Sequence, residues 1–348
     1  MSNQHSKLER CVFIDPSYPV FNSDGIFDLA DPVLNRDGQL LPFNRLRENM
    51  MSRRISVRTA DYLVNNSSKD KYQIDYYSLG IVDNFEKILT DGRARMAAFV
   101  IMEPPVVSPE LYAALPRLTE VFDRVYVHNT NGDGYLLDGV NADKLYKMYY
   151  PIPYNDVLNP YWENNKREKR IVVINGNHNP RARDREQYSL RIHAMAELSK
   201  IGVVDLYGMG WNRWWSRSAM WLPYWRNFRA LMSIYKGKCA SKFEVLQNYE
   251  FCLCFENMSM DGYITEKIFD CLYAGTIPLY MGAPDILDYI PEDVFVDCRK
   301  YLTWTEMWEN VAMMPAEKIE TMKRAGRSFL QSVEAKKFYD SMEHICGA

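Results

Sequence analysis

The sequence contains no apolar run of the roughly 18 residues that a membrane-spanning helix requires. Its first residues are polar and include no apolar stretch of the kind found in secretory signal peptides. A net charge of −3 gives no general reason to expect a nucleic acid as partner. We therefore expect a cytoplasmic protein, and a composition of 47% hydrophobic and 25% charged residues is typical of globular chains.

Paired cysteines are also missing. The chain has seven cysteines, an odd number, and none forms the Cys-x-x-Cys pattern typical of zinc or redox sites. Cys252 and Cys254 lie two residues apart in an apolar run, so on a strand they share a face but lie too close along the chain for an easy disulfide. We expect reduced, structural cysteines.

Three signatures of nucleotide and metal chemistry are absent as well. No convincing Asp-x-Asp occurs, the pair Gly208 and Gly210 lacks the third glycine of a dinucleotide fingerprint, and there is no Gly-x-x-x-x-Gly-Lys-(Ser/Thr). His128, His178 and His193 are scattered without metal-ligand spacing. Hydride transfer, P-loop phosphoryl transfer and a histidine metal centre are therefore disfavoured.

The remaining pattern is typical of an α/β fold with two Rossmann-like halves. In the first half, apolar runs that suit strands alternate with stretches of helical spacing. The second half repeats this alternation from Ile171, with a helix at about 184–200, and a helical tail begins at about 316. In the first half we expect strands at 11–15, 55–63, 96–102 and 124–129, and helices at 42–53, 82–90 and 109–122.

A plausible linker separates the halves. The segment 150–162 is rich in proline and aromatic residues, and the charged segment 164–170 follows it. We predict domains at 1–160 and 161–325 and a C-terminal helical tail at 326–348.

The most informative segment is the apolar run 251–255 with the charged groups that follow it. Five apolar residues suit a buried parallel strand, which would place Glu256 at the carboxyl end where ligands of open α/β sheets gather. Thr265 is a candidate N-cap and Gly275 a natural helix stop, so Lys267 lies in the first turn. This arrangement suits phosphate binding at a helix N-terminus. The alternative is an ordinary strand-loop-helix with a solvated Glu-Lys pair.

The segment FCLCFENMSMDGYITEKIFDCLYAGTIPLYMGAPDILDYIPEDVFVD, residues 251–297, closely resembles the signature of family 10 glycosyltransferases, the α-1,3/α-1,4-fucosyltransferases. The resemblance implies the GT-B architecture, in which two Rossmann-like domains with parallel sheets face each other. It also implies inverting transfer of L-fucose from GDP-fucose to a hydroxyl of a glycan acceptor, such as lipopolysaccharide or O-antigen. Many eukaryotic members carry a membrane anchor, so this chain looks more like the soluble bacterial type.

Two upstream segments extend the resemblance. IVVINGNHNP, residues 171–180, is similar to the strand that precedes the family's donor-site helix and includes Asn175, although Gly176 departs from the usual order. The same alignment places Arg191 on the family's pyrophosphate-binding arginine. FVIMEPP, residues 99–105, is similar to the segment with the catalytic glutamate, which would be Glu103.

The resemblance implies a role for each of these residues. Glu103 would be the general base, and Arg191 and Lys267 would neutralise the departing diphosphate. Glu266 would serve either the ribose or the developing positive charge. Further residues assigned to the nucleotide and sugar pocket are Asn175, Glu256, Asn257 and Tyr263. Because these cations can hold the phosphates, we expect neither a metal nor another cofactor. The alternatives are a solvated loop carboxylate at Glu103 and a surface helix arginine at Arg191.

One segment departs from the family pattern. Residues 209–243 contain five tryptophans and seven lysines or arginines but no acidic residue. This composition suits the interface of an anionic membrane, so the segment could dock the enzyme on the inner face of the membrane near a lipid-linked acceptor. Alternatively, the tryptophans pack on the second domain and the cations are solvated or face nucleotide phosphate.

Two other functions stay open at this point. The signature mainly concerns diphosphate and ribose, so an enzyme of the same fold could use a different nucleotide sugar. The chain could also be a non-catalytic nucleotide-sugar-binding module, although the joint presence of Glu103, Arg191 and Lys267 argues against that.

Overall fold

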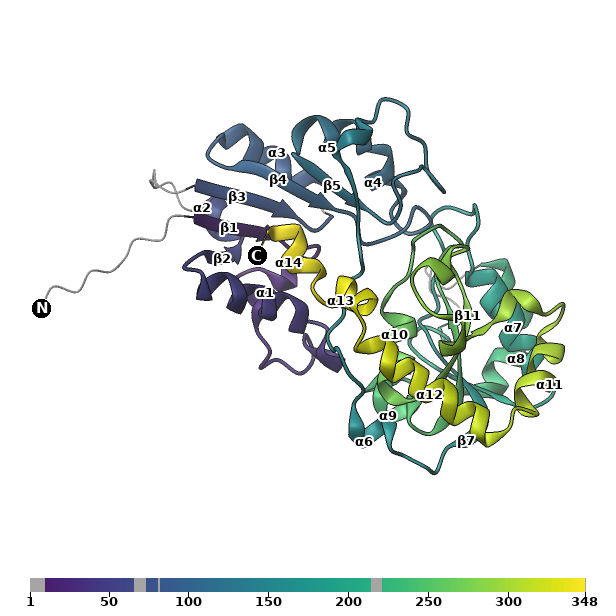
Figure 1. The fold of residues 1–348 in the computed structure, drawn as a ribbon. Coiled ribbons are helices and arrows are strands. Elements are labelled where there is room, and N and C mark those ends of the chain that lie inside the picture. Colours follow the sequence, from purple (N-terminus) through teal and green to yellow (C-terminus); the bar gives the residue numbers. More distant parts are fainter. Residues whose placement is uncertain (1–9, 66–72, 81, 214–220, 348) are drawn as a thin grey trace, which may run out of the picture. The chain divides into compact units, whose positions relative to one another are not determined.

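The computed structural model describes residues 10–65, 73–80, 82–213 and 221–347. The chain divides into two compact units (Figure 1). Unit 1 consists of Met1–Pro153 together with Phe338–Ala348, and unit 2 consists of Tyr154–Lys337. The sequence analysis placed the first boundary after residue 160 and the second after 325. Each unit is described separately below.

Unit 1 contains a six-stranded parallel sheet of order β2-β1-β3-β4-β5-β6. Apolar clusters cover both of its faces, as a parallel sheet requires. One cluster includes Leu46 of α1 and Ile345 of α14, and the other includes Phe85 of α3 and Leu118 of α5. The strands are β1 (Arg10–Asp15), β2 (Ser56–Thr59), β3 (Gln73–Ser78), β4 (Arg95–Val100), β5 (Arg124–Val127) and β6 (Leu145–Lys147).

The helices of unit 1 lie between these strands in the chain, apart from the C-terminal one. They are α1 (Leu41–Ser52), α2 (Asp61–Asn65), α3 (Val82–Asp91), α4 (Pro109–Ala113), α5 (Leu115–Val121) and α14 (Ser341–Cys346). Helix α13 (Val333–Tyr339) crosses the boundary between the units.

Two expectations for unit 1 were wrong in detail, and two strands were missed. The predicted strand 55–63 is strand only over Ser56–Thr59, and the chain then turns into α2. The predicted helix 109–122 is two helices that meet at Ala114, because Pro116 in the first turn of α5 lacks the N–H that would continue α4. Strands β3 and β6 were not predicted.

Unit 2 also contains a six-stranded parallel sheet, of order β12-β11-β10-β7-β8-β9. The strands are β7 (Glu168–Ile174), β8 (Val204–Tyr207), β9 (Tyr235–Gly237), β10 (Tyr249–Phe255), β11 (Ile277–Met281) and β12 (Val296–Asp297). The helices are α6 (Asn159–Trp162), α7 (Tyr188–Ser199), α8 (Leu222–Ile234), α9 (Lys242–Leu246), α10 (Glu266–Ala274), α11 (Trp304–Ala312) and α12 (Ala316–Leu330).

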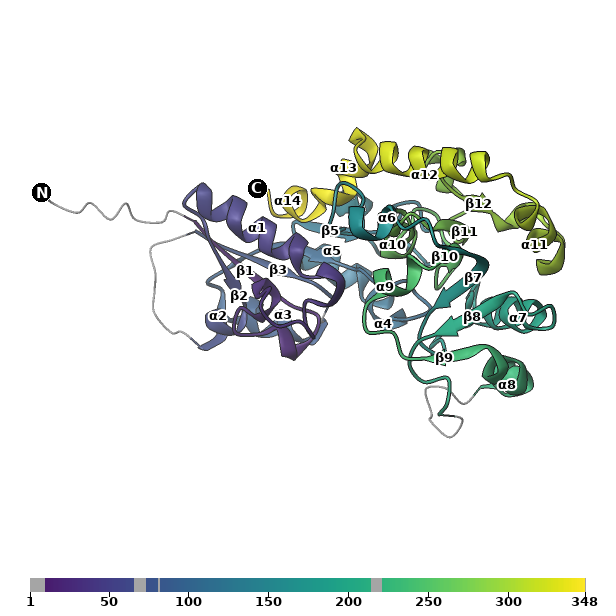
Figure 2. The same cartoon turned by 90° about the horizontal axis from the view of Figure 1, so that it is seen from below.

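The helices of unit 2 form two groups. Helices α7 and α8 pack together, whereas α10 packs against α6, α9 and α12. In both views the sheet lies between the α7–α8 pair and α10 (Figure 1 and Figure 2). This follows from the topology, because right-handed crossovers that leave adjacent strands in opposite directions place their helices on opposite faces.

Within the residues that the structure describes, no helix combines the length and the apolar character that a bilayer crossing demands. The predicted helical tail is present as α12, α13 and α14, the last of which belongs to unit 1.

Candidate functional site

The candidate site lies where the chain leaves β7 and β10. These strands are neighbours in the sheet, yet the chain continues from β7 to β8 on one side and from β10 to β11 on the other. Such a switch point leaves a crevice at the carboxyl ends of the two strands, where open α/β sheets bind ligands. Glu256 follows β10 directly and Asn175 follows β7, as the sequence predicted.

A buried carboxylate organises this crevice. Glu256 is fully buried, and its Oε1 accepts the backbone N–H of Thr265 at 2.8 Å. Its Oε2 accepts the Thr265 hydroxyl at 2.9 Å and the Lys267 ammonium at 2.9 Å. The Lys267 Nζ also donates to Thr265 Oγ1 at 2.9 Å. Glu256 therefore holds the start of α10 through three groups.

Thr265 precedes α10 as its N-cap, at the predicted position, but its side chain makes no cap bond to the helix. The carboxylate of Glu256 takes the backbone N–H of Thr265 instead, and a negative charge there suits the positive end of the helix dipole. A Glu-Lys pair is present, but it is largely shielded from solvent: the side chain of Glu256 is 0% exposed and that of Lys267 is 18% exposed.

Lys267 keeps its charge in this environment. Burial alone would lower the pKa of Lys267, but the carboxylates of Glu256 and Glu266 outweigh it and raise the pKa above the ordinary value. An ammonium has three N–H donors, and Glu256 and Thr265 use two of them. Among the described residues no other side chain or carbonyl takes the third, which is therefore available to an anion.

Glu266 also stays ionised. Burial alone would raise its pKa, yet the charges of Lys267 and Lys242 lower the pKa of Glu266 below the ordinary value. A carboxylate with a lowered pKa is a poor proton donor at neutral pH. It is better suited to accept hydroxyl groups of a sugar or to stabilise a positive charge.

Arg191 is a buried cation next to the same strand end. It lies in the first turns of α7, is 3% exposed, and its Nη2 donates to the carbonyl oxygens of Phe255 at 2.7 Å and Glu256 at 3.1 Å. Its guanidinium carbon lies 5.4 Å from the centre of the Tyr188 ring. Burial lowers the pKa of Arg191, but an arginine keeps its charge at neutral pH.

The Nε of Arg191 is buried and has no hydrogen-bond partner among the described residues. An unpaired charged donor is costly inside a protein, so this atom would gain from an incoming acceptor such as a phosphate oxygen. The predicted alternative, a surface arginine, does not fit this burial. Nearby His178, partly desolvated and facing the Arg191 charge, has a lowered pKa.

The other predicted pocket residues surround these charges. Asn257 accepts the Gln187 backbone N–H through its carbonyl oxygen at 3.0 Å, which ties the loop after β10 to the start of α7. Tyr263 is 1% exposed, and its electrostatic interaction with Arg191 partly offsets the lowering of the Arg191 pKa by burial. Asn175 donates its backbone N–H to Tyr207 at 3.0 Å.

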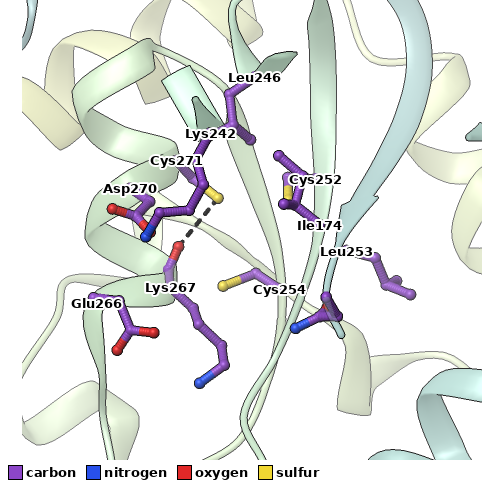
Figure 3. Close-up of a pocket in the computed structure, with 11 residues that line it drawn as sticks. Ile174, Lys242, Leu246, Cys252, Leu253, Cys254, Glu266, Lys267, Asp270 and Cys271 are labelled. Carbon is purple, nitrogen blue, oxygen red and sulfur yellow. Dashed lines mark hydrogen bonds and ion pairs between the residues drawn. The ribbon is translucent and has the colours of Figure 1, made fainter. Parts of the chain in front are cut away.

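A small cavity of about 80 Å³ lies between α9, α10 and the strands β7 and β10. Asn175, Glu266 and Lys267 contribute to its wall, and Figure 3 shows the thiols of Cys254 and Cys271 between the helix and the strand. Ligand pockets usually measure about 300–1,000 Å³. The cavity can therefore hold only part of a nucleotide sugar.

The cysteines near this cavity are reduced, as predicted. All seven cysteines are free. Hydrogen bonding with the neighbouring thiols, together with burial, raises the pKa of Cys271, and burial raises the pKa of Cys254. Thiols of this kind are inert, so these residues fill space rather than react.

Glu103 belongs to unit 1. It follows β4 at the carboxyl edge of that sheet and is partly buried. Two buried side chains bind its own carbonyl oxygen and the one before it: the Tyr112 hydroxyl donates to Glu103 at 3.1 Å, and Nε2 of His128 donates to Met102 at 2.9 Å. The loop that presents this carboxylate is therefore fixed by two contacts.

No group of three histidine, cysteine, aspartate or glutamate side chains in the described ranges is arranged to hold a metal ion. Metal independence itself stays a prediction. Sequence reasoning also missed three polar neighbours of the site, namely Thr265 as a hydrogen-bonding group, the ion pair of Lys242 with Asp270, and Gln187. Only Thr265 had a signal in the sequence, since a threonine at an N-cap position is a candidate hydrogen-bonding group.

Comparison with known proteins identifies this unit. Residues 165–325 match the family model described as glycosyltransferase family 10 (fucosyltransferase) C-term. The chain carries the C-terminal domain of glycosyltransferase family 10. The matched range contains every predicted site residue of unit 2, from Asn175 to Lys267.

Several curated proteins resemble parts of the chain. It is 31% identical over 100 residues to the alpha-(1,3)-fucosyltransferase FucT of Helicobacter pylori, which covers 28% of the chain and 21% of that protein. It is 29% identical over 122 residues to GDP-fucose protein O-fucosyltransferase 3 of Bos taurus, covering 29% of the chain and 25% of that protein. The chain thus spans about a quarter or less of the length of these relatives.

Solved structures confirm the predicted α/β fold class of the GT-B type, with two parallel sheets flanked by helices. A crystal structure of an alpha1,3-fucosyltransferase with GDP matches with a TM-score of 0.54 at 16% identity, covering 100% of this chain and 93% of that one. Anabaena Alr3699/HepE in complex with UDP and glucose matches with a TM-score of 0.58 at 10% identity, covering 98% of this chain and 100% of that one. At such identities the likeness concerns the fold alone.

Proposed function

We propose that the protein is an inverting fucosyltransferase that moves L-fucose from GDP-fucose to a hydroxyl of a glycan acceptor. The observation that carries the proposal is the gathering of Arg191, Lys267 and Glu266 at the switch point of a family 10 domain. Relatives with matching segments are named for fucosyl transfer, and the name of one group of them includes GDP-fucose.

The leaving group is a nucleoside diphosphate, which needs positive charge as the glycosidic bond breaks. Arg191 offers its unpaired Nε, and Lys267 offers its third N–H. Both groups already sit in fixed hydrogen bonds to the end of β10, so little reorganisation is needed when the phosphates arrive. Glu266, held ionised by Lys267 and Lys242, would stabilise the positive charge that develops on the sugar or bind the ribose.

The acceptor hydroxyl must lose a proton, and Glu103 is the proposed base. It lies at the carboxyl end of β4 before two prolines, and a residue that precedes proline is disfavoured in the helical conformation. Asn175, Glu256, Asn257 and Tyr263 would shape the nucleotide and sugar pocket. Because the protein supplies the cations itself, the reaction needs no metal.

Calorimetric titration tests the donor assignment. GDP-fucose, GDP-mannose, GDP and UDP-sugars are titrated with and without EDTA, into the wild type, Lys267→Ala, and Lys200→Ala as a control for an exposed lysine of the same unit. We expect GDP-fucose to bind selectively and independently of metal. Lys267→Ala should weaken binding at least about 10-fold, as loss of a phosphate-binding charge implies, and Lys200→Ala should not. Tighter binding of another nucleotide sugar would overturn the fucosyl assignment.

Turnover tests the enzymatic assignment against a binding module. Release of GDP from GDP-fucose is followed with a panel of short glycan acceptors. Glu103→Gln should lower kcat by about 10²–10⁴-fold, the usual contribution of a general base, and leave GDP-fucose affinity unchanged. Full activity of Glu103→Gln would remove Glu103 from the mechanism.

We further propose that the outward face of α8 contacts an anionic membrane. Trp211 and Trp221 are buried, as the packing alternative predicted, whereas Leu222 is 59% and Trp225 41% exposed. Arg226 and Arg229 are exposed next to them on the same helical face. Trp214, Trp215 and Arg217 lie outside the described residues. Segment 209–243 contains no acidic residue, and exposed aromatic and cationic groups suit an anionic surface.

Vesicle co-sedimentation tests this contact. Wild type should bind vesicles that contain anionic lipid and not vesicles of neutral lipid. The variant Trp225→Ala/Arg226→Glu/Arg229→Glu should lose binding, whereas Lys318→Glu/Arg324→Glu, which reverses two exposed charges on α12, should retain it. Binding that is equal for both variants would exclude α8 as the docking face.

A further inference from the structure

The loop that follows β7 is held by the segment that follows β8. The backbone N–H of Asn175 donates to the carbonyl oxygen of Tyr207, the last residue of β8, at 3.0 Å, and that of Asn177 donates to Met209 at 2.9 Å. The indole N–H of Trp211 then donates to the carbonyl oxygen of Asn175 at 2.7 Å. The first residues of the tryptophan-rich segment 209–243 therefore bind the loop that carries a predicted donor-site residue.

The approach of the two segments is too close for a side chain. A Cβ on Gly208 would lie 1.9 Å from the carbonyl oxygen of Asn175, and Gly208 has φ +141°, which side chains rarely adopt. Its carbonyl oxygen accepts the Tyr235 hydroxyl at 2.9 Å, and its N–H donates to Gly237 at 2.9 Å. Strand β9 thus supports the loop contact from behind.

Trp211 is itself fixed. Its side chain is 2% exposed, and its carbonyl oxygen accepts the hydroxyl of Tyr224, a fully buried residue of α8. A second tryptophan of the segment, Trp221, lies 5.2 Å beneath the guanidinium of Arg183 in the same loop. The loop between β7 and α7 is therefore bound at two points by this segment.

The loop keeps a polar atom unsatisfied. Asn177 is 3% exposed, and its Nδ2 donates to Gly210 at 3.4 Å, while its Oδ1 is buried without a partner among the described residues. A buried acceptor without a partner costs free energy unless a ligand donates to it. The contacts to residues 209–211 hold the loop so that the Oδ1 of Asn177 is left for a donor on a ligand instead of a donor in the loop itself.

We propose that Trp211 is a positioning residue for the sugar-nucleotide site, acting through the carbonyl oxygen of Asn175 to hold the 175–179 loop before the donor arrives. The proposal rests on the proposed function, because the loop is assigned to the donor there. Trp211 is buried and cannot contact a membrane, so this role is separate from the proposed membrane contact of α8. Preorganised loops bind more tightly because less ordering accompanies binding.

The test compares Trp211→Phe with Trp308→Phe, a partly buried tryptophan of the same unit that packs on Phe251 at the opposite end of β10. Hydrogen exchange of backbone amides in 174–187 is measured without ligand, and GDP-fucose affinity and kcat are measured in the full-length protein. Trp211→Phe should speed exchange in 174–187 and weaken affinity about 3- to 10-fold, the range for one lost hydrogen bond, with kcat at saturation unchanged. Trp308→Phe should do neither.

Tyr224→Phe, which removes only the hydroxyl on Trp211, is the second variant and should shift both quantities in the same direction by less. Exchange in 174–187 that stays at the wild-type rate in Trp211→Phe would overturn the proposal. So would faster exchange spread over the whole of unit 2, or unchanged donor affinity. Failure of the proposed function gives a different pattern, since wild type would then not bind GDP-fucose while the exchange measurement still reports on the loop.

Discussion

At the scale of single residues, the site is built on buried charges that are paired within the protein. Glu256 has no contact with solvent and yet carries a full set of partners from Thr265 and Lys267. Removing one partner of such a pair leaves the other charge buried and uncompensated, at a cost of about 3–5 kcal/mol. The Lys267→Ala titration therefore needs a thermal unfolding measurement beside it, so that lost binding is not mistaken for lost folding.

Asp75 in unit 1 is a second paired charge, and it makes stability depend on pH. Its side chain is 0% exposed and binds Arg10 and, at 2.7 Å, Arg95. Burial alone would raise the pKa of Asp75, but the hydrogen bonds from Arg95 and Arg10 outweigh it and lower the pKa. The stabilisation is therefore present above the unfolded-state pKa, near about 4, and is lost as the pH falls through the lower folded-state pKa.

Asp75→Asn should lower the free energy of unfolding by about 1–3 kcal/mol at pH 7, the range for hydrogen bonds to charged groups. The difference from wild type should shrink as the pH falls below about 4. Urea unfolding at several pH values measures it, with Asp143→Asn as a control on an exposed aspartate of the same unit. A difference that is constant across this pH range would contradict the assigned pKa shift.

The pattern of residues revealed much of the site but not its internal bonding. Glu256, Thr265 and Lys267 were singled out because each lies at the junction of an apolar run and a helical repeat, and both signals are local. That Lys267 binds Glu256 depends on side chains that meet only after the strand and helix are packed. The support of Asn175 by Trp211 spans 36 positions and has no local signal.

At the scale of elements, the C-terminal end of α10 is bound by a largely buried arginine, Arg167. Gly275 ends it with φ 72°, in the left-handed conformation that glycine tolerates. Arg167 then donates to the carbonyl oxygens of Ala274 and, at 2.7 Å, Tyr161, and to Thr276 Oγ1 at 3.2 Å. Burial lowers the pKa of Arg167 to about 10, so the residue stays charged at neutral pH.

Arg167→Met should lower the free energy of unfolding by about 2–4 kcal/mol, because several buried carbonyl oxygens lose their donor while the aliphatic packing is largely kept. Arg167→Lys should fall between Met and wild type, since an ammonium cannot reach all of these acceptors. Chemical denaturation measures both. Arg324→Met, at an exposed site on α12, is the control, and an equal effect of all three substitutions would show that the carbonyl contacts carry no special stability.

The loop after β4 gives an element-scale prediction about the proposed base. Tyr112→Phe removes the hydroxyl that binds the Glu103 carbonyl oxygen and keeps the ring against Tyr135, 5.0 Å away between centres. We expect kcat to fall about 3- to 10-fold, the range for one hydrogen bond, with GDP-fucose affinity unchanged. Steady-state kinetics and calorimetry measure the two quantities. Loss of donor affinity without loss of kcat would contradict a role in placing Glu103.

The elements that sequence analysis missed share a cause. Strand β3 contains Asp75 and Gln73, which break the apolar pattern, and the aspartate is tolerated only because arginines of β1 and β4 flank it. Strand β6 has three residues, too few for any periodicity. In contrast, β10 and α10 were predictable, since five buried apolar residues and a capped helical repeat need no partner to be recognised.

At the scale of the whole molecule, the division of the chain places residues 338–348 in unit 1, although they follow unit 2 in sequence. Met342 and Ile345 join the apolar cluster of α1 and β1, and Glu343 binds Arg45 at 3.1 Å. The last helix is therefore part of the core of unit 1 rather than an appendage.

Deleting residues 338–348 should loosen unit 1 and spare unit 2. Burial of two large apolar side chains contributes about 1.5–3 kcal/mol each, so backbone amides of β1 and β3 should exchange at least about 100-fold faster. Amides of β7 and β10 should keep their wild-type exchange rates. Equal acceleration in both units would show that the tail supports the protein as a whole.

The same division sets the order in which the protein can be completed on the ribosome. Domains usually fold from the N-terminus during synthesis. Here the segment Tyr154–Lys337 is synthesised entire before the last helix of the first unit. Unit 1, which holds Glu103, therefore acquires its full core only after residues 338–348 have left the ribosome, when every residue of unit 2 has already been made.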